Sequence, residues 1–280
     1  MGASAPGAKR PIRSSVADPG RAAPGGGVRR VRLAGLAKAA SLAEVRAEIV
    51  ACTRCPRLRG YCARIAQEKK AAHRDEVYWG KPVPGFGDPA ARLLIVGLAP
   101  AAHGGNRTGR TFTGDGSGDF LMSALHRTGF ASIPTSRRAD DGLELRDAYI
   151  LAAVRCAPPQ NKPLPEEIAR CRPHMTAEIA ALTRVRVVVA LGKIGHDAYL
   201  AYLAEQGYAR RPRPAFGHGS RAAIERGAGA ALLLGSYHPS RQNTNTGKLT
   251  PEMLEAVFRE ARRVIESQPE EPDGPADAAR

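Results

Sequence analysis

Four short runs of apolar residues lie in the middle of the chain and predict buried strands. They span residues 93–96, 148–154, 186–191 and 231–234. Segments with helical periodicity follow them, near residues 118–128, 165–182, 193–206 and 251–266. Continuously apolar strands that alternate with helices are typical of a parallel sheet covered on both faces. The pattern therefore predicts an α/β fold.

Three polar or glycine-rich loops follow the predicted strands directly. They span residues 97–115, 156–161 and 237–247. Ligand sites in parallel sheets gather at the carboxyl ends of the strands. We therefore expect these loops to share one rim and to carry the functional residues.

The ends of the chain differ in composition from its middle. Residues 1–30 are rich in Gly, Ala, Pro and Arg, and residues 269–280 combine Pro with acidic residues. We predict a disordered basic tail at 1–30, a folded domain at 31–268 and a disordered acidic tail at 269–280. No run of 18 apolar residues occurs, and no secretory signal is recognisable, so we expect a cytoplasmic protein without a membrane span.

The charge is strongly positive. Lys and Arg number 42 against 27 Asp and Glu, which gives a net charge of +15. The tails do not account for this excess, so the folded part is basic too. Such a balance favours a polyanionic partner, most simply nucleic acid, and an association with the nucleoid. An Arg-rich proteome is the alternative explanation.

The chain has five cysteines. An odd number in a cytosolic protein argues against a disulfide framework and favours a metal or cluster site. Cys52 and Cys55 form a CxxC pair, while Cys156 and Cys171 come from the later α/β part. Four cysteines hold either zinc or an iron–sulfur cluster, and their spacing leaves both open. Unrelated buried thiols are the plainer interpretation, and Cys62 is best explained as a core thiol.

The loop GLAPAAHGGNRTGRTFTGD, residues 97–115, has neither a Walker motif nor a dinucleotide fingerprint. Its glycines allow close approach to a ligand, and Phe112 could stack on a planar group. Asp115 is placed to orient a water or to stabilise positive charge. A helix N-cap is the simpler role for Asp115, and Asp119 is a rival carboxylate.

The loop SYHPSRQNTNTG, residues 236–247, begins where the last strand ends. His238 is a candidate donor to a leaving group that gains negative charge. Asn161, on the neighbouring loop, could recognise an amide-like edge. Side chains of the kind that contact DNA follow His238, and they are Ser240, Arg241, Gln242, Asn243 and Thr244. We interpret five other histidines as structural: His73, His126, His174, His196 and His218.

The loops GLAPAAHGGNRTGRTFTGD and HPSRQNTNTG resemble the two motifs of the uracil-DNA glycosylase superfamily, specifically its family 5. The resemblance covers roughly residues 48–265. It implies a three-layer α/β/α fold with a central four-stranded parallel sheet. It also implies that Cys52, Cys55, Cys156 and Cys171 hold a structural [4Fe–4S] cluster, as in the iron–sulfur glycosylases of families 4 and 5.

The same resemblance implies hydrolysis of the N-glycosidic bond of uracil and of other deaminated bases, such as hypoxanthine, in double-stranded DNA. A polar residue in the first motif activates water in better-known members, but Ala99 stands in that region here. The role passes to Asp115, with His238 as its catalytic partner. Gly97, Ala99 and Phe112 would contact the flipped base. Ala152 replaces the Asn that recognises uracil in family 4, and Asn161 is its partial substitute. We expect a monomer.

Two other classes of protein fit parts of the pattern. A non-catalytic nucleic-acid-binding protein with a zinc-stapled α/β domain would explain the charge and the cysteines. A nucleotide-binding transferase would explain the glycine-rich loop, but the missing phosphate-binding motifs argue against it.

Overall fold

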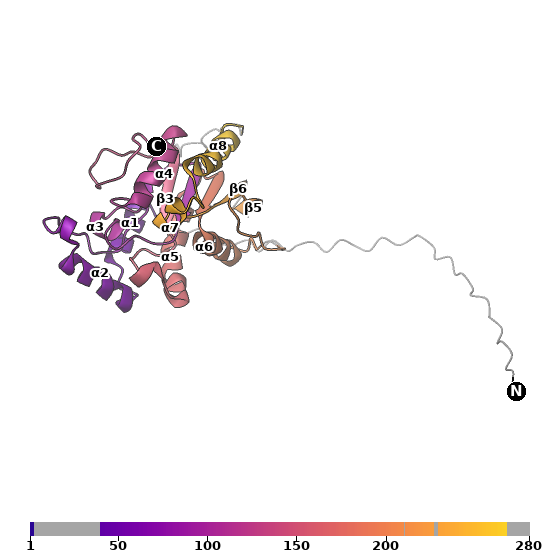
Figure 1. Ribbon diagram of the computed structural model, residues 1–280, viewed down its shortest axis with the longest axis horizontal. Coiled ribbons are helices and arrows are strands. Elements are labelled where there is room, and N and C mark those ends of the chain that lie inside the picture. Colours follow the sequence, from indigo (N-terminus) through magenta and orange to yellow (C-terminus); the bar gives the residue numbers. More distant parts are fainter. Residues whose placement is uncertain (3–39, 210, 227–228, 268–280) are drawn as a thin grey trace, which may run out of the picture. The chain divides into compact units, whose positions relative to one another are not determined.

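The computed structural model describes residues 1–2, 40–209, 211–226 and 229–267 (Figure 1). Nearly all of both predicted tails therefore lies outside the described residues. One compact unit spans Lys38–Arg280, and all elements below belong to it. Within the described residues, no helix is both long and apolar enough to cross a membrane.

Six strands form one mixed sheet in the order β1-β3-β2-β4-β6-β5. The four predicted strands are present and run parallel in the order β3-β2-β4-β6. The prediction was incomplete at the edges, because β1 and β5 each pair antiparallel with an outer parallel strand. The strands are β1 (Phe86–Gly87), β2 (Leu93–Gly97), β3 (Ala148–Ala152), β4 (Val187–Leu191), β5 (Arg221–Arg226) and β6 (Gly229–Ser236).

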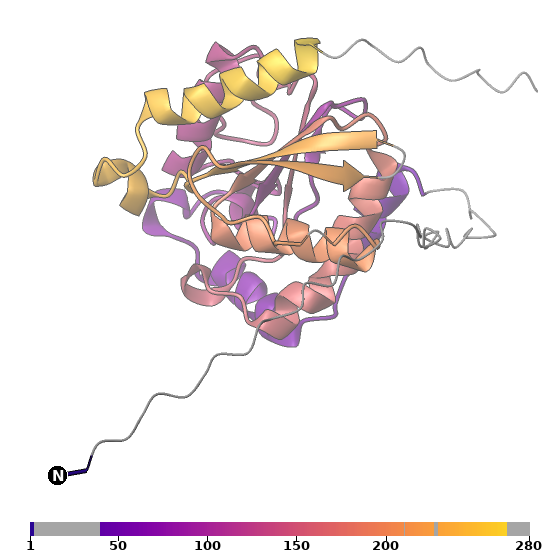
Figure 2. The same cartoon turned by 90° about the vertical axis from the view of Figure 1, so that its right-hand side faces the viewer.

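Helices cover both faces of this sheet, as predicted. Figure 2 shows the sheet between α8 on one side and α6 on the other. A proline is the first residue of both α5 and α8, where its missing N–H costs no hydrogen bond. The helices are α1 (Leu42–Ala51), α2 (Pro56–Glu68), α3 (Gly105–Thr108), α4 (Gly116–Arg127), α5 (Pro165–Ala181), α6 (Lys193–Glu205), α7 (Arg241–Asn245) and α8 (Pro251–Ser267), with 3₁₀ turns η1 (Ala71–His73) and η2 (Pro159–Asn161).

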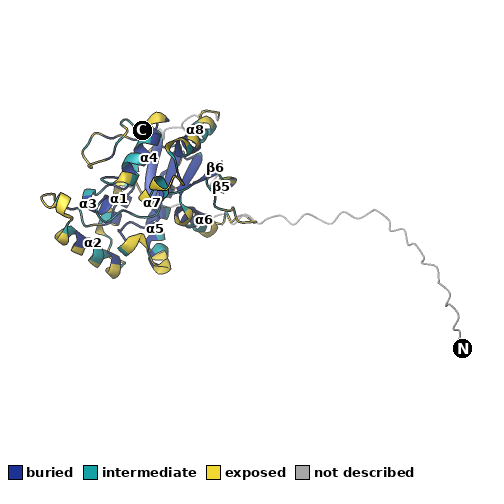
Figure 3. Ribbon diagram, viewed as in Figure 1, coloured by how far each residue is buried: buried dark blue, intermediate teal, exposed yellow. Residues whose placement is uncertain are grey.

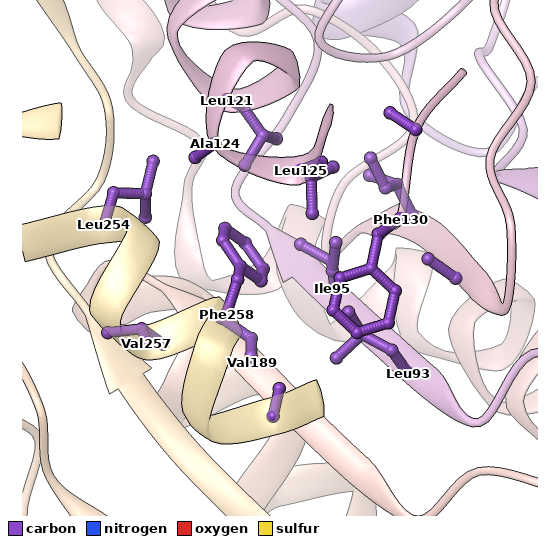
Figure 4. Packing of buried hydrophobic residues seen from close by; sticks show 14 of the residues in the cluster. Leu93, Ile95, Leu121, Ala124, Leu125, Phe130, Val189, Leu254, Val257 and Phe258 are labelled. Atoms are coloured by element: carbon purple, nitrogen blue, oxygen red, sulfur yellow. The ribbon is translucent and has the colours of Figure 1, made fainter. Parts of the chain in front are cut away.

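Two apolar cores lie on opposite faces of the sheet. On one face, Phe258 of α8 and Leu125 of α4 pack over Ile95 of β2 (Figure 4). On the other face, Ile179 of α5 and Tyr199 of α6 belong to the second core. The central strands between them are buried along their length (Figure 3). Burial of both faces explains why these strands have no polar alternation.

The strand order creates a crevice at the carboxyl ends of β2 and β4. The chain passes from β2 to β3 on one side and returns to β4 on the other, which is a topological switch point. Gly192 follows β4 and lies close to His238, since an added Cβ there would come within 3.2 Å of the His238 Cβ. The loops after β4 and β6 therefore meet at this rim.

Candidate functional site

A cavity of about 350 Å³ opens on the predicted rim. The loop after β2, the loop after β3 and the start of α7 supply three of its walls. A fourth wall comes from α2 and the segment that follows it. The lining residues are Tyr61, Lys70, His73, Ala101, Ala102, His103, Gly104, Gly114, Asp115, Pro158, Gln160, Asn161 and Arg241. A larger cavity of about 1180 Å³ lies along α6 and β5, away from the candidate residues.

Asp115 has two roles in this structure. Its Oδ1 accepts a hydrogen bond from the Gly118 N–H at 3.0 Å, so it is the N-cap of α4. It also lines the cavity. Its Oδ2 lies so close to Gly104 that an added Cβ there would come within 2.3 Å of it. Gly104 is therefore needed for the close approach of the loop to this carboxylate.

The surroundings of Asp115 raise its pKa. Burial is the main cause, and the charge of Asp119 adds to it, while hydrogen bonds from Gly118 and Ser117 and the charge of Arg241 oppose it. A carboxylate that is desolvated at the wall of a cavity is a stronger candidate for proton transfer than one in water. The capping role and the chemical role thus coexist in one side chain.

Asp119, the rival carboxylate, has a structural partner. Its Oδ1 accepts a hydrogen bond from the backbone N–H of Ser136 at 2.9 Å. Asp119 is absent from the residues that line the cavity. The geometry therefore favours Asp115.

Phe112 joins the two loops. Its backbone has φ of 50°, a left-handed conformation that non-glycine residues rarely adopt. Its ring lies against Gly97, where an added Cβ would come within 2.8 Å of Cε2. The same ring lies 5.7 Å from the His238 ring, centroid to centroid, at an interplanar angle of 30°. Gly97, Phe112 and His238 are thus brought together, next to one another but outside the set of residues that line the 350 Å³ cavity.

His238 is held as a neutral imidazole at neutral pH. Burial lowers the pKa of this side chain to about 4. Its backbone carbonyl accepts hydrogen bonds from the Asn243 Nδ2 and the Ser240 N–H, both at 2.8 Å. These bonds fix the backbone, while the described residues provide no partner for the ring nitrogens. The ring can therefore donate to a ligand.

Two arginines of the first loop brace it from within. Arg107 donates to the Gly114 carbonyl at 3.1 Å and to the His103 carbonyl at 2.9 Å. Arg110 pairs with Asp141 at 2.8 Å and donates to the Ser136 hydroxyl at 3.1 Å. Both guanidinium groups are buried. Sequence reasoning did not find this role, because the motif alone does not show whether an arginine faces inward.

The predicted DNA-contacting residues divide into two groups. Ser240 caps α7, and the Asn243 and Thr244 side chains bond the backbone carbonyls of His238 and Ser240. Arg241 and Gln242 are exposed. Arg241 lines the cavity and interacts electrostatically with Asp115. Among the five residues, Arg241 and Gln242 are thus the two whose side chains face solvent and are not used in hydrogen bonds within the described part of the protein.

Asn161 lines the cavity as predicted, on η2, where Gln160 and Asn161 both have left-handed backbones. Ala99 instead packs against the cysteine-containing cluster. Sequence reasoning missed Lys70 and His103, and it interpreted His73 as structural, although all three line the cavity.

The remaining histidines differ in their surroundings. His126 is exposed, His196 packs against Phe216, and the ring of His218 hydrogen-bonds the backbone of Tyr237 at 3.3 Å. The contacts of His196 and His218 are those of structural residues, whereas His126 faces solvent. His174 lies elsewhere, beside the cysteines.

The four predicted ligand cysteines line one small cavity. Cys52 and Cys55 come from the turn between α1 and α2, Cys156 follows β3, and Cys171 lies in α5. Cys62 is not part of this wall. Its thiol donates to the Ala157 carbonyl at 3.6 Å and forms a second hydrogen bond with the thiol of Cys156. The predicted set is thus brought together from distant segments.

The chemistry of this cavity fits a thiolate-bound metal group. Within the described residues, no group of three or more Cys, His, Asp and Glu side chains is placed as it would be around a metal ion. Burial raises the pKa of Cys171 to about 11, and burial together with Cys156 raises that of Cys55. Only a cationic partner would make such thiols thiolates at neutral pH. His174 also lines the cavity, and its buried Nε2 has no partner.

Comparison with known proteins agrees with this geometry. The sequence model of the uracil DNA glycosylase superfamily matches residues 84–262. A type-5 uracil-DNA glycosylase of Mycobacterium bovis is 49% identical over 227 residues, which are 81% of this chain and 82% of that one. The type-5 enzyme of Thermus thermophilus is 50% identical over 77% of this chain and 94% of its own.

A type-4 uracil-DNA glycosylase of Pyrobaculum aerophilum is less similar. It is 33% identical over 46% of this chain and 58% of its own. The higher identity and coverage of the type-5 relatives agree with the resemblance found from the two loops. They also argue against a non-catalytic binding protein and a nucleotide-binding transferase. The chain belongs to the uracil-DNA glycosylase superfamily and is a DNA glycosylase, a hydrolase.

Proposed function

We propose that this protein removes uracil from double-stranded DNA, and hypoxanthine and other deaminated bases with it, by hydrolysing the N-glycosidic bond. The observation that carries the proposal is the position of Asp115, desolvated at the wall of a cavity that also has a cationic rim. The names of the type-5 relatives support uracil as the base.

The glycosidic bond of a duplex is hidden in the base stack, so the target nucleotide must be flipped into the cavity. Flipping costs a few kcal/mol. Contacts between basic side chains and DNA phosphates offset that cost. Arg241, exposed at the cavity rim, is suited to contact the backbone or to fill the gap left by the flipped base.

Cleavage breaks the bond between C1′ of the sugar and the base nitrogen, and its electron pair leaves with the base. The sugar gains positive charge until a water oxygen bonds C1′. The Asp115 carboxylate stabilises that charge and orients the water, and it accepts the proton that the water releases. Burial raises the pKa of Asp115 above that of an ordinary Asp, which makes its carboxylate a stronger base.

The departing base gains negative charge on its ring. His238 is neutral, so it can donate an N–H hydrogen bond to a carbonyl oxygen of the base without first carrying a charge of its own. Phe112 lies beside it and supports the planar ring, while Gly97 keeps the strand end free of a side chain.

The range of bases follows from the pocket's few amide groups. Ala152 ends β3 and has no side chain able to bond uracil selectively. The side-chain amides that line the cavity are those of Gln160 and Asn161, on the loop after β3. A pocket with so little hydrogen-bond selection should accept hypoxanthine as well as uracil.

We also propose that Cys52, Cys55, Cys156 and Cys171 hold a [4Fe–4S] cluster. The cluster would tie the N-terminal helices to the α/β body, because its ligands come from both. Protein purified without oxygen should show a broad absorption band near ~400 nm, together with iron and sulfide. Stoichiometric zinc in a colourless protein would contradict the cluster.

The function is tested by single-turnover base release from duplexes that contain one uracil or one hypoxanthine. Release of both bases, lost in Asp115→Asn, is expected. The Asp119→Asn variant is the matched control, since its carboxylate does not line the cavity. Release of neither base by the wild-type protein would contradict the proposal.

A further inference from the structure

One part of the cavity wall is built by a segment that neither motif includes. Residues 70–80 lie N-terminal to the part matched by the superfamily model, residues 84–262. Lys70 and His73 of this segment line the cavity together with His103 of the first motif. The wall thus carries three nitrogen-bearing side chains, and Arg241 stands on another part of the rim.

This segment is fixed on the first motif by paired contacts. The N–H groups of Trp79 and Gly80 donate to the carbonyls of Arg107 and Asn106 at 2.9 and 3.0 Å. Glu76 accepts from the His73 Nδ1 at 2.6 Å and pairs through its other oxygen with Arg107. His73 is therefore held by one nitrogen, and no hydrogen-bond partner of its Nε2 lies among the described residues.

The tautomer of His103 follows from its partner Tyr78. The Tyr78 hydroxyl lies 3.1 Å from the His103 Nδ1 and accepts a hydrogen bond from the Lys70 N–H at 3.3 Å. Tyr78 is buried and has one hydroxyl hydrogen to donate. Among the described residues, the acceptor within reach of this hydrogen is the His103 Nδ1. Nδ1 is then unprotonated, so the hydrogen of the neutral ring is on Nε2.

The charges on this wall call for an anion. The charges of Lys70, His73 and Arg107 lower the pKa of His103, after burial as the main cause, which keeps its ring neutral. Both carboxylate oxygens of Glu76 are occupied, one by the His73 Nδ1 and the other by Arg107. Lys70 and His103 therefore face the cavity with donors and without a carboxylate of their own.

We propose that Lys70 and His103 form a binding site for one backbone phosphate of the nucleotide that enters the cavity. The inference rests on the proposed function, because a flipped nucleotide brings its flanking phosphate to the rim as its base goes inward. Exposed donors at such a rim contact phosphates, whereas base recognition needs the interior. His103 donates its Nε2–H, Lys70 supplies charge, and Tyr78 is a positioning residue.

The experiment measures binding to a duplex with an uncleavable abasic analogue. A set of such duplexes carries a neutral methylphosphonate in place of one phosphate at a time near the lesion. His103→Ala should weaken binding to the unmodified duplex by about tenfold or more, as for the loss of a hydrogen bond to a charged group. On one member of the set this loss should vanish, because that member lacks the charged partner.

Three further variants make the test specific. Tyr78→Phe should reproduce part of the His103→Ala loss on the same phosphate, with an unchanged melting temperature. Lys70→Met should lower the slope of log Kd against log salt concentration by about one. His126→Ala, on the exposed face of α4, is the matched control and should bind like the wild type.

Two results would overturn the site. His103→Ala could bind the analogue normally and yet slow base release, which would place His103 on the sugar or the base. The loss could also persist on every methylphosphonate duplex, which would mean that no single phosphate is the partner. Because the analogue has no base to remove, binding is measured separately from glycosylase activity. A wild-type protein that shows the phosphate coupling but releases no uracil would contradict the proposed function alone.

Discussion

Asp115 can be separated into its two roles by a pair of substitutions. Asn and Asp are nearly equal as helix N-caps, so Asp115→Asn keeps the bond to the Gly118 N–H and removes the charge. Asp115→Ala removes both. The cap contributes about 1 kcal/mol to the free energy of unfolding. In a domain of this size that corresponds to a melting temperature lower by about 2–4 °C for the alanine variant.

The chemical role predicts a much larger effect on the rate. Loss of a general base or charge stabiliser slows the chemical step by ~10²-fold or more, which is about 2.7 kcal/mol of activation free energy. Asp115→Asn should show this loss with a nearly unchanged melting temperature. Asn has the same shape as Asp, so it also fits against Gly104, where there is no room for additional atoms.

The measurement is single-turnover release of uracil and thermal melting, both on the same protein preparation. A rate close to that of the wild type in Asp115→Asn would refute the catalytic role and leave only the cap. Asp119 would then be the next carboxylate to test. Because Asp119 holds the Ser136 backbone, its substitution should first of all loosen the loop that Ser136 belongs to.

The pH dependence of the wild-type rate gives a second view of Asp115. The carboxylate is the active form, so the rate should rise as pH increases through the pKa of this group. Burial raises that pKa, so the acidic limb should lie above the ordinary Asp range near ~4. Asp115→Asn should lose this limb. If the rate of Asp115→Asn still rises over the same pH range as that of the wild type, another group is responsible for this pH dependence.

Three other outcomes are expected. His238→Ala should slow base release, and less so for bases that leave easily. Burial lowers the pKa of His238 to about 4, whereas the same group in the unfolded chain has a pKa of about 6.5. As the pH falls from about 6.5 to about 4 the unfolded chain binds a proton that the folded chain does not, so the free energy of unfolding should decrease over this range. Urea unfolding measured across this pH range should show the decrease in the wild type, and His238→Gln should lack the part that comes from His238. Cys171→Ser should lose iron in metal analysis while Cys62→Ala keeps it. Glu178→Ala should lower the free energy of unfolding by about 3–5 kcal/mol, measured in urea, because it leaves the buried Arg155 without its partner at 2.5 Å.

The parts of the fold that could be predicted from the sequence are those that are buried on both sides. Strands β2, β3 and β4 are buried at every position, so their sequences are continuously apolar. The edge strands β1 and β5 have no such signal. β1 is two residues long, and β5 carries charged residues such as Glu225 on an edge that is paired on one side only.

The candidate site was predictable where residues follow a strand directly. Asp115 and Asn161 line one cavity, and His238 lies against Phe112 of the same first loop, because parallel strands place their carboxyl ends together. The wall formed by Lys70 and His73 could not be predicted in this way. That segment has no apolar periodicity, and its position depends on hydrogen bonds to the first motif, which only the folded chain shows.

Polar loop residues were the hardest to interpret because the same side chain can face inward or outward. Arg107 and Arg241 lie in similar polar sequences. Arg107 is buried and braces a loop, whereas Arg241 is exposed at the cavity. Composition therefore indicated a DNA-binding protein more reliably than it indicated which arginines contact DNA.

The two sites of this protein share a wall, and this contact explains how a structural metal group could support chemistry elsewhere. Ala99 and Ala102 of the first motif pack against the apolar cluster that contains Cys156 and Cys171. Asn106 of the same motif donates to the Cys62 carbonyl at 3.3 Å. A shift of the cysteines would therefore reach the loop that ends at Asp115. Under the proposed function, catalysis needs that carboxylate held in place, so we expect the cysteine site to contribute by keeping the first motif fixed.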